Sequence, residues 1–121
     1  MASVSEGVLV INGKVVPDTE VLIMWAMATR DFPSTNVHLH EVLENTISDL
    51  SLRTLINRSI DRGLVKRSKV TASVGGIVAS RVVWYPVPEV AELLRHPDVQ
   101  PTFVKKLAER KRKLAEKKGD V

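Results

Sequence analysis

The spacing of apolar residues changes at Gly63, and this change constrains the fold more than any other feature of the chain. Over residues 51–62, leucine and isoleucine recur at helical spacing, which predicts a helix with one buried stripe. Residues 64–85 instead alternate as strands do, on either side of a turn that contains Gly75 and Gly76. Gly63 stands where a glycine commonly ends a helix. The sequence therefore predicts a helix followed directly by a β-hairpin.

A second, shorter hairpin is predicted near the N-terminus. Residues 8–16 hold two apolar runs separated by Asn12 and Gly13, a pair that favours a two-residue turn because both positions need positive φ. A helix is expected next, over residues 19–30. Its eight consecutive apolar residues, 21–28, would cover more than one face, so the helix either lies at the centre of the core or packs one side against a second subunit. Together with the hairpin, this pattern leads us to expect a homodimer.

Most of the remaining chain is predicted to be helical. A second helix is expected over residues 37–45, a short one over residues 89–95, and a last one from Pro101 to about residue 118. The fold class is therefore α+β and mostly helical. We expect residues 1–96 to form the domain and residues 97–121 to carry a basic C-terminal helix.

The last helix allows two interpretations. A narrow apolar stripe, interrupted by Lys111, is typical of a seam that packs or dimerises. Its residues are Val104, Leu107, Ala108, Leu114 and Ala115. A basic tail that follows a nucleic-acid backbone is the competing interpretation. We expect packing over residues 103–107 and a solvated basic face beyond them.

The formal net charge of +4 hides a strong asymmetry along the chain. Residues 51–81 carry seven basic side chains against one acidic side chain, a net charge of +6. Residues 105–118 carry eight basic against two acidic side chains, also +6, and the rest of the chain sums to −8. Two basic blocks on an otherwise acidic chain predict a surface that binds a polyanion, most simply nucleic acid.

The order of three helices followed by a β-hairpin with a glycine turn resembles the winged helix-turn-helix family. The segment that carries the similarity is residues 51–67, where a helix with polar outward residues continues into Gly-Leu-Val-Lys-Arg, as in MarR-like and PadR-like bacterial and archaeal regulators. The similarity covers residues 19–85. It implies core helices within residues 19–62, a wing over residues 64–85, and a transcriptional regulator that binds double-stranded DNA with its third helix in the major groove.

The third predicted helix offers side chains that suit this role. Arg53, Asn57 and Arg58 carry the forked donors and acceptors that distinguish base edges. Thr54 can reach a base or a phosphate, and Asp61 can accept from cytosine but more simply pairs with a neighbouring cation. Basic side chains on the wing suit phosphate contacts, which position a protein without reading sequence. These wing residues are Lys66, Arg67, Lys69 and Arg81.

Two other functions fit the same sequence. The +6 C-terminal block and the short outward side chains also suit a chromatin-like protein that binds any duplex, with a steep dependence on salt. The wide apolar surface of the first helix also suits a winged-helix subunit that binds other proteins in a transcription, replication or ribosomal assembly.

Several other classes of protein are not expected. Without cysteine, the chain has no disulfide, no thiolate zinc site and no cysteine nucleophile. His38 and His40 lie two residues apart and would point to different sides of a helix, so no metal site is predicted. No residues stand in a nucleophile elbow or a glycine-rich phosphate loop, so we expect neither enzyme activity nor a cofactor. The longest apolar run, residues 21–28, is too short to span a membrane, and we expect a cytoplasmic, nucleoid-associated protein.

Overall fold

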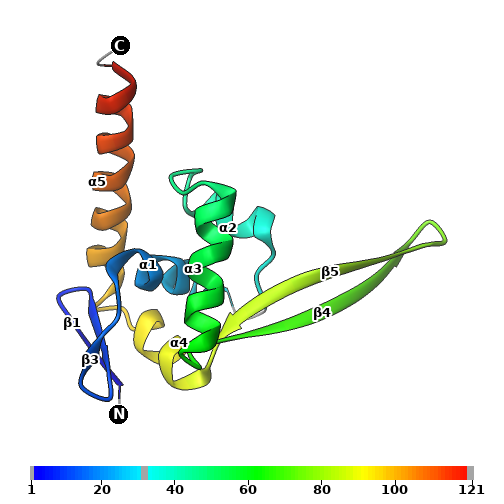
Figure 1. Cartoon of the computed structure of the whole chain (residues 1–121), viewed down its shortest axis with the longest axis horizontal. Coiled ribbons are helices and arrows are strands. Elements are labelled where there is room, and N and C mark those ends of the chain that lie inside the picture. The colour runs from blue at the N-terminus through cyan, green and yellow to red at the C-terminus, as the bar shows by residue number, and fades with distance from the viewer. Residues whose placement is uncertain (1, 31–32, 120–121) are drawn as a thin grey trace.

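The computed structural model describes residues 2–30 and 33–119 (Figure 1). The described residues form an α+β fold with five helices, a three-stranded N-terminal sheet and a separate β-hairpin. The elements, in chain order, are β1 (Ala2–Ser5), β2 (Val8–Ile11), β3 (Lys14–Val15), α1 (Asp18–Ala28), α2 (Asn36–Val42), α3 (Asp49–Asp61), β4 (Val65–Val74), β5 (Ile77–Pro86), α4 (Pro88–Arg95) and α5 (Gln100–Gly119). Each helix and hairpin that the sequence predicts is present, with small shifts at its ends.

The structure differs from the sequence prediction in the N-terminal sheet and at the end of α2. Strand β1 is an addition, paired antiparallel with β2 through a turn at Glu6 and Gly7, whose φ angles are 52° and 78°. Helix α2 ends at Val42 rather than at residue 45. Its extension is blocked because Glu44 and Asn45 both adopt left-handed backbone, with φ angles of 51° and 55°.

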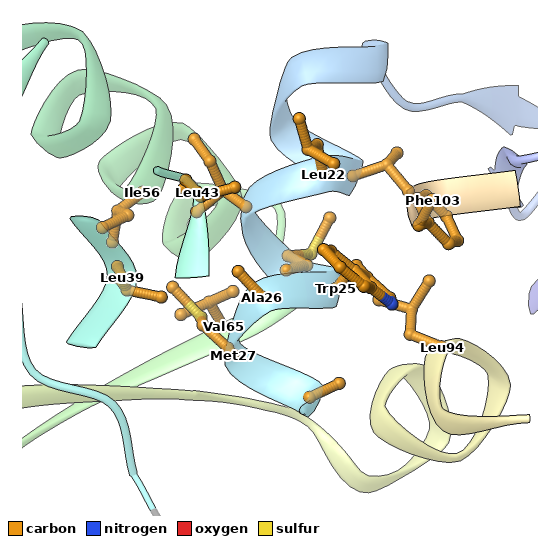
Figure 2. Packing of buried hydrophobic residues seen from close by; sticks show 14 of the residues in the cluster. Leu22, Trp25, Ala26, Met27, Leu39, Leu43, Ile56, Val65, Leu94 and Phe103 are labelled. Carbon is orange, nitrogen blue, oxygen red and sulfur yellow. The ribbon is translucent and has the colours of Figure 1, made fainter. Parts of the chain in front are cut away.

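Helix α1 lies at the centre of the molecule, and every residue from Glu20 to Ala28 is buried (Figure 2). It contacts all four other helices as well as β2 and β5. Trp25 stacks on Phe103 of α5 with ring centroids 5.8 Å apart, and its Nε1 donates a 2.9 Å hydrogen bond to Gln100 Oε1. The sequence allowed this helix to lie either at the centre of the core or against a second subunit. The structure places it at the centre of the core. The apolar breadth of α1 is therefore no evidence for a subunit contact.

Helix α5 is fixed to the core by its first turns and projects from the body beyond them (Figure 1). Phe103 and Leu107 are buried, as the sequence predicts, and most of the described side chains after Leu107 are exposed. Polar contacts reinforce this attachment, since Lys106 Nζ donates to the Gly7 carbonyl at 3.2 Å and Arg110 Nε donates to the Thr46 carbonyl at 3.2 Å. In the described part of the chain, no helix combines the length and apolar character that crossing a membrane requires.

Strands β4 and β5 form a long antiparallel ribbon that projects from the helices (Figure 1). All ten residues of β4 pair with residues of β5, and Gly75 and Gly76 make the turn with positive φ. At the base of the ribbon, Ser34 forms an isolated antiparallel bridge with Trp84, through backbone hydrogen bonds of 2.8 and 2.9 Å. This bridge joins the segment between α1 and α2 to β5, and it holds the base of the ribbon against the helices.

Candidate nucleic-acid interface

Helix α3 carries four of the eight site residues predicted from sequence, and the β4–β5 ribbon beside it carries the other four (Figure 1). The helix begins at Asp49, two residues earlier than predicted, because the Ser48 hydroxyl caps it by accepting from the Ser51 amide at 3.2 Å. Leu52 and Ile56 are buried and set the inner side of the helix. The outer side, which is exposed, therefore has a fixed orientation relative to the core.

The four predicted residues of α3 are all exposed, but they point in different directions. Thr54 and Asn57 lie near the middle of the outer side, opposite Leu52 and Ile56. Arg53 and Arg58 are five residues apart, which at 3.6 residues per turn separates them by about 140° around the helix axis. The two arginines therefore lie on opposite flanks of the helix, with Thr54 and Asn57 between them.

Arg53 is held in place by a cluster around Asp49. The Asp49 carboxylate accepts from Asn36 Nδ2 at 2.7 Å, and it lies 3.2 Å from His40 Nε2 and 3.1 Å from Arg53 Nε. The hydrogen bonds from Asn36 and His40, aided by the charge of Arg53, lower the pKa of Asp49, although its partial desolvation acts in the opposite direction. The carboxylate therefore stays ionised and links both ends of α2 and the first turn of α3 to the Arg53 guanidinium.

His38 and His40 are both partly buried. The ring of His40 lies in the Asp49 cluster. His38 is half-buried, and its pKa is lowered by burial first and by the charge of Arg30 second, against the opposing effect of Glu41. Among the residues that the structure describes, no group of three His, Asp or Glu side chains is arranged to hold a metal ion.

The hydroxyl of Thr54 is already engaged within the helix. Its Oγ1 donates a 2.9 Å hydrogen bond to the Leu50 carbonyl, one turn earlier. The hydroxyl proton is therefore not free to donate to a base or a phosphate, and the oxygen retains only its acceptor capacity. The Asp61 pairing expected from sequence is also missing, since the described residues give Asp61 no ion-pair partner.

A cleft of 210 Å³ lies between the outer side of α3 and the base of the β4–β5 ribbon. Its lining combines the polar side chains of Arg53 and Asn57 with Arg67 from β4 and with Val82 and Trp84 from β5. Three residues predicted from sequence as DNA contacts are thus brought together from two elements. Their donors surround a recess to which β5 contributes the apolar side chains of Val82 and Trp84.

The strand register divides the four predicted basic residues of the ribbon between its two faces. Arg67 pairs with Trp84, and Lys69 pairs with Val82, so both basic residues share the face that meets α3. Lys66 pairs with Tyr85 and Arg81 pairs with Val70, which places these two on the opposite face. All four side chains are exposed. Only Arg67 and Lys69 therefore extend the basic surface of α3.

The outer half of the ribbon carries no charge. Residues 71–80 contain no Lys, Arg, Asp or Glu, and Ile77 and Val78 are exposed there. The basic residues of the ribbon all lie in the half nearer the helices.

Comparison of the chain with protein-family models, with curated proteins and with solved structures gives no match.

The sequence analysis missed Leu50, which is 78% exposed in the first turn of α3. Starting the helix at residue 51 leaves Leu50 in a connecting segment, where its direction is undefined. The signal that would have placed it is Ser48, three residues before Ser51, which is the spacing of an N-cap hydroxyl and the amide that it accepts. With the helix started at Asp49, Leu50 falls on the outer side, in line with Thr54 and Asn57.

Proposed function

We propose that this protein binds double-stranded DNA as a transcriptional regulator, with α3 in the major groove and the β4–β5 ribbon as a wing on the adjacent backbone. The observation that carries this proposal is the cleft where Arg53 and Asn57 of α3 meet Arg67 of β4. A major groove admits one α-helix, and its walls are rows of phosphates. The polar outward residues of α3 supply groups for the base edges inside the groove, and the basic strand beside it supplies groups for the phosphates.

The order of elements supports a winged helix-turn-helix fold for this proposal. Helices α1, α2 and α3 are followed directly by a hairpin, in the order that the resemblance implies. The bridge between Ser34 and Trp84 anchors that hairpin next to α3. A wing held in this way moves with the helix that it accompanies, so both can contact one duplex together.

The alternatives drawn from sequence receive less support. The apolar surface of α1, which favoured a module for binding other proteins, lies inside this chain. Part of the charge on α5, which favoured a chromatin-like protein, is paired within the molecule. Lys106 Nζ lies 3.6 Å from Asp18 Oδ1, and Lys111 Nζ lies 3.0 Å from Glu44 Oε1.

A homodimer belongs to the same proposal, with α5 as the contact between subunits. Val104, Ala108, Lys111 and Ala115 follow one another at spacings of four, three and four residues, which is the spacing of a coiled-coil seam. They line an open groove of 400 Å³, and Val104 is exposed there. A dimer places two copies of α3 on two half-sites of one duplex. A Val104→Glu substitution is expected to give a monomer in analytical ultracentrifugation.

The test of DNA binding is a titration at two salt concentrations, with the protein's own promoter and a random duplex of equal length. We expect Arg53→Ala combined with Arg58→Ala to lower promoter affinity at least about tenfold, since each lost contact weakens binding by about 1 kcal/mol or more. The matched control is Lys105→Ala combined with Lys117→Ala, which removes the same charge from exposed positions of α5. Equal losses of affinity in the two double variants would show that net charge alone, and not the position of the arginines, causes the loss. If the wild-type protein binds neither duplex, the proposal is refuted.

A further inference from the structure

The middle of the outer side of α3 forms a single line of side chains. Leu50, Thr54, Asn57 and Asp61 follow one another at spacings of four, three and four residues, so they share one helix face. All four are exposed, and the face lies opposite the buried residues Leu52 and Ile56. We call these four residues the centre line of α3. When a helix lies in a major groove, the line opposite its buried side is the one that meets the floor, where the base edges are.

The two arginines lie beside the centre line rather than on it. At about 100° per residue, Arg53 is displaced to one side of the line and Arg58 to the other. Arg53 is further restrained, because its Nε lies 3.1 Å from Asp49 Oδ2. Its terminal amino groups are left for a contact at the groove wall. In this geometry, the two arginines are placed to contact phosphates, one on each DNA strand. Their residue type alone would instead suggest contacts with guanine.

The chemistry of three of the four centre-line residues, Leu50, Thr54 and Asn57, matches adenine and thymine. Leu50 presents an isobutyl group that is 78% exposed. Thr54 presents its methyl group, because its hydroxyl donates to the Leu50 carbonyl. Asn57 presents a carboxamide, which pairs with adenine through N6 and N7, and apolar groups contact the methyl group of thymine. Neither Leu50 nor Thr54 has a donor to offer to guanine.

The spacing along the helix sets the distance between the two contacts. Seven residues separate Leu50 from Asn57, which is about 10.5 Å along the axis at 1.5 Å per residue. One base pair occupies about 3.4 Å of the duplex. The two side chains are therefore about three base pairs apart on the groove floor.

We propose that α3 selects duplexes with a thymine methyl group facing Leu50 and an adenine about three base pairs away facing Asn57, while Arg53 and Arg58 contact the flanking phosphates. The proposal rests on the proposed function, and it adds the class of base sequence that the site selects. It also assigns the apolar contact to Leu50, a residue whose chemistry alone does not suggest DNA binding. The exposed leucine and the engaged threonine hydroxyl carry the assignment.

The test begins with selection of bound duplexes from a random pool by the full-length protein. The enriched sequence is then rebuilt with deoxyuridine in place of each thymine in turn, which removes the C5 methyl group and leaves every hydrogen-bonding group of the base. We expect one such replacement to weaken binding about fourfold, the effect of taking one buried methyl-sized group out of contact. In the Leu50→Ser variant, the same replacement is expected to have no effect.

Two further variants separate base contacts from backbone contacts. Asn57→Ala is expected to remove the adenine preference at one position, with a loss of at least about fivefold on the selected duplex. Arg58→Ala is expected to weaken binding to every duplex alike and to reduce the slope of log affinity against log salt concentration by about one. The effect of the deoxyuridine replacement is expected to be as large in this variant as in the wild-type protein. Leu50 and Arg58 are both exposed, so neither substitution disturbs the core, and circular dichroism checks this.

The outcomes distinguish this proposal from the function on which it rests. If the wild-type protein binds no duplex, both fail. If it binds duplexes without enriching any sequence, or if deoxyuridine has no effect at any position, DNA binding stands and the selection by the centre line is refuted. The selection is also refuted if the effect of deoxyuridine is unchanged in Leu50→Ser.

Discussion

The ion pair between Glu20 and Arg62 connects the end of α3 to the first turn of α1. Arg62 Nε lies 3.0 Å from Glu20 Oε2, and the Glu20 side chain is completely buried. Its second carboxylate oxygen, Oε1, has no hydrogen-bond partner among the described residues. Replacing Arg62 with methionine keeps most of the aliphatic stem and removes the guanidinium. The substitution therefore leaves a carboxylate in the core without its charge partner.

Removal of one partner from a buried ion pair destabilises a protein by about 3–5 kcal/mol. Arg62 is 41% exposed, so water already screens part of the attraction, and we place Arg62→Met at the lower end, about 3 kcal/mol. The entropy of unfolding is about 2.1 cal/mol/K per residue near the melting temperature. For 121 residues, 3 kcal/mol then lowers the melting temperature by about 12 °C. The combined Glu20→Met and Arg62→Met variant is expected to recover most of this loss, because methionine is compatible with the buried position.

Calorimetry and urea unfolding of the variants measure these differences directly. Arg58→Met is the matched control, since it removes an exposed arginine from the same helix and is expected to change the free energy of unfolding by less than about 0.5 kcal/mol. Glu20→Met alone is expected to be milder than Arg62→Met, because the arginine that it leaves unpaired can reach water. If Arg62→Met proves as harmless as the control, or if the double variant is less stable than Arg62→Met, the buried carboxylate does not depend on this partner.

Three further predictions concern the packing of α5, a tight turn and one carboxylate. Phe103→Ala should lower the free energy of unfolding in urea by about 3–5 kcal/mol, whereas Lys105→Ala, at an exposed position outside the proposed α5 seam, should change it by less than about 0.5 kcal/mol. Gly7→Ala should be more destabilising than Gly13→Ala by thermal unfolding. Both need positive φ, but only at Gly7 would the new Cβ lie within 2.8 Å of side-chain atoms of α5. The pKa of Asp49 is lowered in the folded state, so its ionisation stabilises the fold fully at any pH above the ordinary pKa of the carboxyl group. This stabilisation is lost as the pH falls from the ordinary pKa through the lower folded-state pKa. Asp49→Asn should accordingly be less stable than wild type at neutral pH and converge with it in acid, and carbon NMR of the carboxyl group should show the low pKa.

The sequence predicts the elements of this fold well where local signals mark both ends. Gly63, with a φ of 78°, ends the α3 segment, and Gly75 and Gly76 fix the turn of the ribbon. Strand β1 escapes prediction because its alternation of small residues is weak and its turn relies on Glu6 in a left-handed conformation, which a glutamate does not signal. For α1 the sequence leaves two positions open, the core centre and a subunit contact, because a helix that is apolar on all sides predicts burial without identifying its neighbours.

The candidate site is predictable in composition but not in arrangement. Polar residues opposite a buried stripe identify the outer side of α3 from sequence alone. The restraint on Arg53 depends on Asn36, which is 13 residues from Asp49 and is brought to it only by the packing of α2 on α3. Similarly, alternation separates Lys66 from Arg67 on the first strand, but only the register across the hairpin shows which of them shares a face with Arg81.

The central position of α1 has a consequence for the order in which the molecule is completed during synthesis. Its apolar residues leave the ribosome early, but Phe103, which covers Trp25, belongs to the last helix described. Until α5 emerges, α1 can pack on β2, α2, α3, β5 and α4, but the side that carries Trp25 lacks its cover from Phe103. The core therefore closes late, through contacts between residues far apart in the chain, a topology associated with slower folding. Interruption of synthesis before α5 would leave a fragment that exposes Trp25 and the core surface around it, and such a fragment is prone to aggregate.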